Sequence, residues 1–130
     1  VSRVIVKSGT LNNEDWGFLR SMRNLISVDL SACGNTIMPY EALRDSRCLE
    51  VILPKALTRI ESSAFSGSSI CSIVIPENVT SLGESCFWSC QNLDDVQILG
   101  KIHAGQLLEH FGKMGGTVTG ITGGVFKADE

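Results

Sequence analysis

The stretch "IVIPENVTSLGESCFWSCQNL", residues 73–93, contains a pattern that recurs elsewhere in the chain. Counted from its proline, Pro76, apolar residues follow at plus three, plus six and plus eleven, the last being Phe87. The segment "LEVILPKALTRIESSAF", residues 49–65, has apolar residues at the same three distances from Pro54. Two segments with the same spacing indicate an internal repeat, which is the first property to establish in a sequence.

The repeat extends in both directions. In other coils the position equivalent to Pro54 and Pro76 is held by a different residue, Ser31 in "LISVDLS" and Leu99 in "LDDVQIL". Each time it is preceded by two apolar residues at alternate places. This position falls at residues 7, 31, 54, 76 and 99, with steps of 24, 23, 22 and 23 residues. A period of 20 to 29 residues around an L-x-x-L-x-L core is typical of leucine-rich repeats.

This pattern predicts a leucine-rich-repeat solenoid of about five coils of 22–24 residues. Apolar residues two apart share one face of a short strand. Each coil is therefore expected to add one strand to a parallel β-sheet on one face, and to return through turns or short helices on the other. Stacked coils bury one another's apolar side chains. We expect the array at 1–99, with coils starting near residues 1, 25, 48, 70 and 93.

Both ends of the array are expected to be atypical. In the first coil, Asn12 lies three residues before Asp15, which is a helix-start signal, and predicts a helix of two to three turns. After Leu99 the motif decays, so 100–130 is interpreted as a degenerate C-terminal coil or cap with a Gly-rich tail. That tail could be a flexible terminal segment or a Gly-kinked last strand, and a short helix could place Ile102, Leu107, Leu108 and Phe111 inward.

Composition and charge exclude several classes of function. With 130 residues, 43% apolar and 19% charged, the chain resembles a single globular domain. The net charge is -3 and the eleven Lys and Arg residues form no basic stripe, so nucleic acid is not an expected partner. No apolar run approaches the roughly 18 residues of a membrane span, so membrane insertion is not expected. The first residue is Val1 and no signal peptide is recognisable, so targeting information is expected upstream.

The residues of the repeat resemble a known family, the BspA-type leucine-rich repeat of bacterial and protist surface proteins. Its unit reads approximately I-x-I-P-x-x-V-T-x-I-G-x-x-A-F-x-x-C-x-x-L. The matching positions are Pro76, Val79, Thr80, Leu82, Gly83, Phe87, Cys90 and Leu93, while Cys86 replaces the alanine. The resemblance is strong over 49–99, fair over 1–48, and ends near residue 100. It implies a secreted or surface-anchored binding or adhesion protein, located outside the cell or at its surface, without catalytic residues.

The cysteines and histidines suggest a metal site at first sight. The spacing of Cys86, Cys90, His103 and His110 approaches that of a zinc finger, but the gap between the histidines is too long. The resemblance places Cys90 at the repeat's own cysteine position and Cys86 at a small core position. Because free cysteine behaves as a small buried hydrophobe, we predict that both lie in the core and that no metal or other cofactor is bound.

The other three cysteines leave alternatives open. Cys48 and Cys71 both lie just ahead of their strands in neighbouring coils, and either form a disulfide or are two buried thiols. Cys33, in the "SACGN" turn, is expected to be the most exposed thiol. No Ser–His–acid set and no phosphate-binding loop is visible, so we expect no enzyme activity. Asn78, in Asn-Val-Thr, forms an N-glycosylation sequon that has meaning only in a eukaryotic secreted protein.

The side chains that point away from the core should form columns on the exposed sheet face. One column is Arg3, Ser27, Glu50, Ser72 and Asp95, and the next is Ile5, Asp29, Ile52, Val74 and Gln97. In these columns Ile52 and Val74 would make an apolar patch, and such patches often mark interaction sites. The candidate ligand face consists of Arg3, Ile5, Asp29, Glu50, Ile52, Ser72, Val74, Asp95 and Gln97.

Two functions are compatible with this face. The first is a non-catalytic surface module that binds a protein or glycan. The second is a structural spacer of a larger surface protein, with the ligand site elsewhere and the patch covered by another domain or by a second copy of the chain. β-Branched residues are also simply good strand formers, so Ile52 and Val74 by themselves do not decide between the two.

Overall fold

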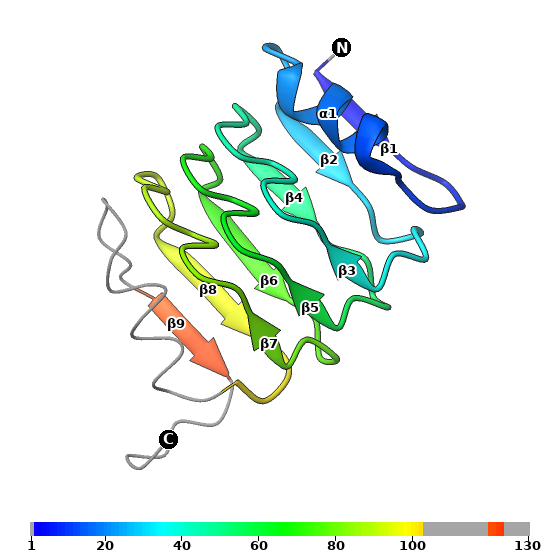
Figure 1. The fold of residues 1–130 in the computed structure, drawn as a ribbon. Helices are drawn as coiled ribbons and strands as arrows, with labels where there is room; N and C mark the ends of the chain where they lie inside the picture. The colour runs from blue at the N-terminus through cyan, green and yellow to red at the C-terminus, as the bar shows by residue number, and fades with distance from the viewer. Residues whose placement is uncertain (1, 103–119, 124–130) are drawn as a thin grey trace.

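The computed structural model describes residues 2–102 and 120–123 (Figure 1). Its main element is a six-stranded sheet in the order β1-β2-β4-β6-β8-β9, with all neighbouring strands parallel. One strand comes from each successive coil, so the fold is the predicted leucine-rich-repeat solenoid. The strands are β1 (Arg3–Ile5), β2 (Ser27–Asp29), β4 (Glu50–Ile52), β6 (Ser72–Ile75), β8 (Asp95–Ile98) and β9 (Gly120–Gly123).

The core lies behind this sheet and is formed by alternate strand residues. Val28, Val51 and Ile73 occupy one inward column and are at most 4% exposed. A second inward column follows two residues later, because side chains alternate between the two faces of a strand. It consists of Leu30, Leu53, Ile75 and Ile98, all of which are buried. The alternation predicted from the spacing is therefore confirmed.

The return side of the coils contains the predicted turns and, in the first coil, a helix, but it also contains strands that were not predicted. Three two-residue strands form a second parallel sheet, in the order β3-β5-β7. Their inward residues, Met38, Ile60 and Leu82, are buried in the same core. The three strands, in front of the larger sheet in Figure 1, are β3 (Ile37–Met38), β5 (Arg59–Ile60) and β7 (Ser81–Leu82). A strand of two residues is too short to produce an alternating pattern in the sequence.

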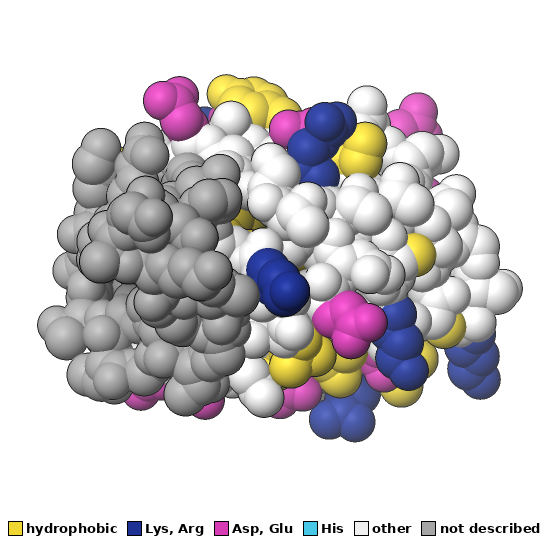
Figure 2. All heavy atoms as spheres, turned by 90° about the horizontal axis from the view of Figure 1, so that it is seen from below, with side chains coloured by type: hydrophobic (Ala, Val, Ile, Leu, Met, Phe, Trp, Pro, Cys, Tyr) yellow, Lys and Arg dark blue, Asp and Glu magenta, His cyan; other side chains and the backbone are white. Residues whose placement is uncertain are grey.

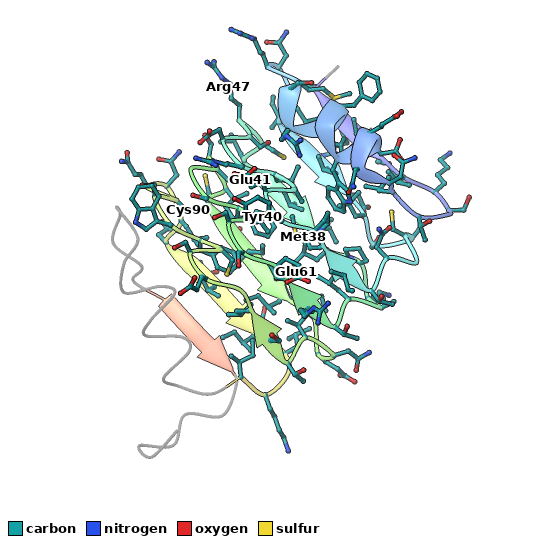
Figure 3. The ribbon with its side chains drawn as sticks, viewed as in Figure 1. Met38, Tyr40, Glu41, Arg47, Glu61 and Cys90 are labelled. Carbon is teal, nitrogen blue, oxygen red and sulfur yellow. The ribbon has the colours of Figure 1, made fainter. Side chains whose placement is uncertain are left out.

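The arc that follows each of these short strands is held by hydrogen bonds between coils. The Leu43 N–H donates to the Ala64 carbonyl at 2.7 Å, and the Phe65 N–H donates to the Cys86 carbonyl at 2.8 Å. The Phe65 and Phe87 rings, both fully buried, stack with centroids 5.2 Å apart and planes 6° from parallel. Figure 3 shows this part of the fold, with Tyr40 and Glu41 in the arc after β3.

Two backbone positions of this arc adopt left-handed conformations in each of three coils. The first is held by Glu41, Ser63 and Ser85, with φ between 55° and 57°. The second is held by Asp45, Gly67 and Ser89, with φ between 58° and 72°. Only one of the six residues is glycine, although glycine adopts this region most easily. The hydrogen bonds between coils impose the same backbone conformation every 22 residues, whether or not the residue at that position is glycine.

The N-terminal coil returns through the predicted helix, α1 (Asn13–Ser21). Asn12 caps it: its side chain accepts a hydrogen bond from the Asp15 N–H, and the Asp15 carboxylate accepts one from the Asn12 N–H. Trp16 and Leu19 are the buried residues of the helix. This capping box satisfies two N–H groups that would otherwise lack partners at the helix start.

The sheet extends beyond residue 99. β9 pairs with β8 in parallel register, from Asp95 opposite Gly120 to Ile98 opposite Gly123. The Gly-rich tail thus contributes a strand, which was one of the two alternatives. Ile102 is buried, while the other residues of the predicted short helix, Leu107, Leu108 and Phe111, lie outside the described residues. The division into an array at 1–99 and a cap at 100–130 stays a prediction.

Candidate ligand-binding face

The register of the six-stranded sheet brings the predicted columns together. Ser27 is paired with Arg3 on one side and with Glu50 on the other. Ser72 is paired with Glu50 and with Asp95. These five residues, one from each of five neighbouring strands, form a polar column across the outer face of the sheet, as expected from the repeat.

The second column lies two residues further along each strand. Asp29 is paired with Ile5 and Ile52, and Val74 is paired with Gln97. Ile52 and Val74 are 43% and 46% exposed, so nearly half of each apolar side chain is open to solvent. In Figure 2 the outer face of the sheet forms the lower edge, where hydrophobic side chains lie among acidic and basic ones.

A groove of about 330 Å³ lies over β4 and β6. Ile52 and Val74 line it, together with Pro76 and Leu99, which stand at the end of their strands. Ser31 and the charged residues Glu50 and Lys55 also contribute to its wall. The volume is at the lower end of the range of small ligand pockets, about 300–1,000 Å³. The groove can therefore take one or two apolar side chains of a ligand.

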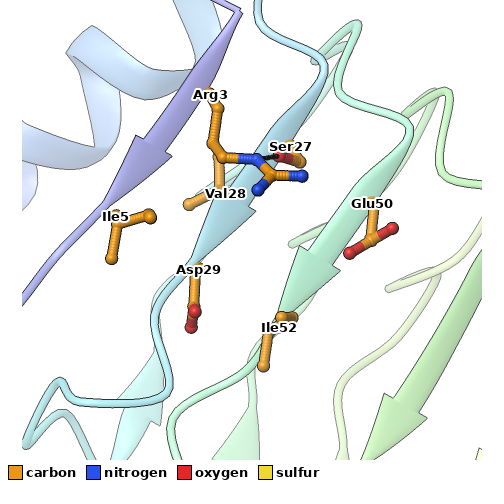
Figure 4. A pocket seen from close by; sticks show the side chains of 7 residues that line it. All are labelled: Arg3, Ile5, Ser27, Val28, Asp29, Glu50 and Ile52. Atoms are coloured by element: carbon orange, nitrogen blue, oxygen red, sulfur yellow. Dashed lines mark hydrogen bonds between the residues drawn. The ribbon is translucent and has the colours of Figure 1, made fainter.

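A smaller hollow of about 80 Å³ adjoins it over β1, β2 and β4 (Figure 4). Arg3 Nε donates a hydrogen bond to Ser27 Oγ at 3.1 Å, which holds the guanidinium across the strands. Asp29 Oδ1 accepts hydrogen bonds from the Ser31 N–H at 2.9 Å and from Ser31 Oγ at 2.6 Å. These hydrogen bonds lower the pKa of Asp29, so this carboxylate is charged at neutral pH.

The two hollows account for most of the predicted ligand face. Arg3, Ile5 and Asp29 line the smaller one, and Ser72 and Val74 line the larger one. Both have Glu50 and Ile52 in their walls, so these two residues connect them. Asp95 and Gln97 continue the same columns on β8, where both are exposed.

The sequence analysis missed an apolar column at the start of the strands. Ile26 and Leu49 are 53% and 42% exposed, and Cys71 follows them on the next coil. The Leu49 N–H donates to the Ile26 carbonyl at 2.9 Å and the Cys71 N–H to the Leu49 carbonyl at 3.0 Å, so the three lie side by side. They line a third hollow, of about 630 Å³, with Glu50 and Ser72. The signal available in the sequence was the apolar residue directly after the first core position of the motif, which is held by Leu25, Cys48 and Ile70.

The exposure of two cysteines was predicted wrongly. Cys33 is only 5% exposed, because it turns inward after β2 as Leu57 does after β4, and burial raises the pKa of its thiol. Cys71 is the exposed thiol. The 22-residue step between these coils places Cys48 level with Ile70, and Cys71 level with Leu49. The residue directly ahead of each strand, Leu49 or Cys71, is exposed, whereas the residue before it, Cys48 or Ile70, is buried. Both are free thiols.

Cys86 and Cys90 are fully buried in the core, as predicted. The Cys90 thiol donates to the Phe65 carbonyl oxygen, with sulfur and oxygen 2.9 Å apart. Burial raises the pKa of Cys90 to about 12 and also raises that of Cys86, so both are neutral thiols at pH 7. Within residues 2–102 and 120–123, no group of three or more His, Cys, Asp or Glu could hold a metal ion. His103 and His110 lie outside the described residues.

Comparisons with known proteins agree with this geometry. The family model of the BspA type leucine rich repeat region matches residues 5–106, in six copies. No curated protein matches the chain. In the part of the chain that the structure describes, no helix is long and apolar enough to cross a membrane. The family is one of surface repeat modules and is typically non-catalytic. With the parallel solenoid and a match over most of its length, the chain belongs to the BspA-type leucine-rich-repeat family.

Proposed function

We propose that this chain is a non-catalytic binding or adhesion module, secreted or displayed at the cell surface, and that it binds its ligand on the outer face of the six-stranded sheet. The observation that supports this most directly is the pair Ile52 and Val74. They lie nearly half exposed, side by side, in a groove of about 330 Å³. Leaving such apolar area in water is unfavourable, by about 25 cal/mol per Å².

The lining of the groove favours a protein ligand over a glycan. The apolar part of its walls is aliphatic, and no Trp, Tyr or Phe is among the described residues that line it. A sugar ring would therefore find no aromatic face to stack on. Glu50 and Lys55 stand in its wall, and neither belongs to the ion pairs found within the described residues. A protein segment with apolar side chains would pack against the aliphatic part of the wall. Charged residues flanking those side chains could pair with Glu50 and Lys55.

The proposal is tested with a screen against immobilised extracellular-matrix proteins and glycans, by surface plasmon resonance. The double variant Ile52→Asp/Val74→Asp places two charges in the groove and should weaken binding at least tenfold. A matched control is Ile37→Asp/Tyr40→Asp, which alters apolar residues that are 38% and 62% exposed on the return side of the coils. Circular dichroism verifies that both variants fold. Equal binding by the wild type and the groove variant would refute the assignment of the face.

A second function, a structural spacer within a larger surface protein, is favoured by the apolar column of Ile26 and Leu49. Together with Ile52 and Val74, this column widens the apolar area that another domain or a second copy could cover. Light scattering distinguishes this case. A dimer that the Ile52→Asp/Val74→Asp variant dissociates, with no binding to any immobilised ligand, would support the spacer.

A further inference from the structure

The first coil leaves one edge of the six-stranded sheet open. β1 is the end strand, and no strand among the described residues pairs with its free edge. The Val6 N–H donates to the Asp29 carbonyl at 3.0 Å, so residues 2, 4 and 6 direct their backbone groups toward β2. Because alternate residues of a strand direct these groups to opposite edges, those of Arg3 and Ile5 point to the free edge. Unpaired groups of this kind are a template for another strand.

β1 lacks the features that commonly protect such an edge. Proteins often place a proline in an edge strand, or a charged side chain that keeps other strands away. The sequence of β1 is Arg-Val-Ile, without proline. Its one charge is drawn away from the edge, because Arg3 Nε donates to Ser27 Oγ at 3.1 Å and the guanidinium lies toward β2 (Figure 4). Another strand can therefore approach the edge.

The core is incompletely covered at the same end. In the part of the chain that the structure describes, four apolar residues pack on the core while they are only partly buried, and all four belong to the first coil. They are Val4, Val6, Leu11 and Met22. The equivalents of the first two in the second coil, Val28 and Leu30, are at most 1% exposed. A later coil is covered on both sides by its neighbours, whereas the described residues cover the first coil on one side only.

Helix α1 adds to this apolar end. Arg20 donates hydrogen bonds to the Glu41 and Ala42 carbonyls at 3.2 and 3.4 Å, which fixes the side of the helix that faces the second coil. Phe18 and Met22 each lie two residues from Arg20, which is about 200° around a helix, so both face away from the second coil. Phe18 is 68% exposed. The apolar end thus continues from the strand layer to the helix layer.

We propose that two copies of this chain dimerise through this end, with β1 of one copy antiparallel to β1 of the other. A two-fold axis at Val4 makes Arg3 and Ile5 of the other copy a hydrogen-bonded pair, and the reverse pair follows by symmetry. Each pair exchanges two hydrogen bonds, so every free N–H and carbonyl of the two edges gains a partner. A contact that pairs a surface with itself is closed, so the assembly ends at two copies.

The two layers of this surface favour a second copy over an extended peptide. A peptide that pairs with β1 would leave Phe18 and Met22 in water. The first coil of another copy brings an edge strand and an apolar helix side together, and it places no like charges opposite each other, because Arg3 faces Ile5. Strands pair about 4.8 Å apart and helices pack about 8–10 Å apart, so the joined sheet would curve with the helices on its outer side. The groove over β4 and β6 stays open to a ligand.

Sedimentation velocity of the whole chain over a range of concentrations tests the dimer. Ile5→Pro removes an N–H that only the dimer uses, and proline is tolerated in an edge strand where its nitrogen faces outward. Phe18→Asp places a charge in the helix layer. We expect each variant to raise the dissociation constant of the dimer at least tenfold, while circular dichroism shows a folded chain. Trp88→Asp, which alters an exposed aromatic residue of the fourth coil, is the matched control and should leave the dimer intact.

Disulfide trapping tests the register. In a Cys71→Ser background, Val4→Cys places two thiols across the axis in a non-hydrogen-bonded pair, with Cα atoms about 4.5 Å apart, which a disulfide can span. Diamide, an azo oxidant, takes up two electrons and two protons from the two thiols as the sulfur–sulfur bond forms. Val6→Cys, in the same inward column, would face Ser2 of the other copy and should not cross-link.

Three results overturn the proposal. They are a wild-type chain that is monomeric at every concentration, a dimer that Ile5→Pro and Phe18→Asp leave intact, and equal cross-linking of the two cysteine variants. The groove variant Ile52→Asp/Val74→Asp separates this dimer from one formed through the sheet face. It should leave the dimer unchanged here, and dissociation by this variant would assign the contact to the face instead. Because the dimer is measured without a ligand, its failure and a failure of ligand binding are distinguishable.

Discussion

Replacing Phe87 by alanine tests the register of the whole array. Phe87 is fully buried and stacks on Phe65 of the preceding coil, with ring centroids 5.2 Å apart. Removing a buried phenylalanine costs about 3–5 kcal/mol, which includes the lost stacking of about 0.5–1.5 kcal/mol. The free energy of unfolding of a domain of this size is about 5–15 kcal/mol, so the loss is a large fraction of the total.

Urea unfolding followed by circular dichroism gives the measurement. With a slope of about 2 kcal/mol per M, the midpoint of Phe87→Ala should fall by about 1.5–2.5 M. The neighbouring Trp88 is 50% exposed, so Trp88→Ala should cost less than about 1 kcal/mol and serves as the control. An unchanged midpoint for Phe87→Ala, or equal shifts for the two variants, would refute the register.

A double-mutant cycle isolates the contribution of the two rings. Leu43 occupies the same column as Phe65 and Phe87, so leucine is a residue that the fold already accepts there. The variants Phe65→Leu and Phe87→Leu, alone and together, should show a coupling energy of about 0.5–1.5 kcal/mol. Additive effects would show that the rings contribute only as apolar volume.

Three further predictions concern the thiols and the helix cap. Native protein should react quickly with a thiol reagent at one site, Cys71, and at the four buried sites only after denaturation; mass mapping of a different first site would contradict this. Burial raises the pKa of Cys86 and of Cys90 above the ordinary value of 9.0, so these thiols ionise at lower pH in the unfolded chain than in the folded one. The free energy of unfolding should therefore fall above pH 9, by about 1.4 kcal/mol per pH unit for each thiol. The variant Cys86→Ala/Cys90→Ser should flatten this alkaline loss in urea titrations at pH 8 to 10.5; an unchanged slope would assign the loss to other groups. Asn12→Ala removes the helix cap and should cost about 1 kcal/mol, whereas Asn12→Asp should cost less; equal losses would show that the cap contributes nothing.

The substitutions in the cysteine variant come from the chain itself. Ala42 and Ala64 hold the position of Cys86 in the two preceding coils, and Ser46 and Ser68 hold that of Cys90. All four of these residues are buried. The Ser68 hydroxyl accepts a hydrogen bond from the Ile70 N–H at 3.3 Å, so a hydroxyl has a partner at this place in the fold. The variant should therefore fold normally.

The sequence by itself determined the solenoid and the columns of its main sheet. Two facts suffice for this: an apolar pair at alternate positions, and a step of 22–24 residues from one pair to the next. Because the side-chain period of a strand is two, each step fixes which residues point inward and which are paired across strands. The strand period and the repeat step together predicted the polar column from Arg3 to Asp95 and the neighbouring pair Ile52 and Val74.

The tertiary structure alone decided the rest, for reasons of geometry. The return segments form a second sheet because similar coils stack in register. The pairing joins residues about 22 positions apart, so it does not follow from the local preference of any one segment for the strand conformation. Cys48 and Cys71 look equivalent in the sequence, yet a difference of one residue in their distance to the strand places them on opposite faces. Each hollow on the sheet face is also lined by side chains from three or four coils. The depth of these hollows therefore arises only when the coils are packed together, and it cannot be read from the sequence of a single repeat.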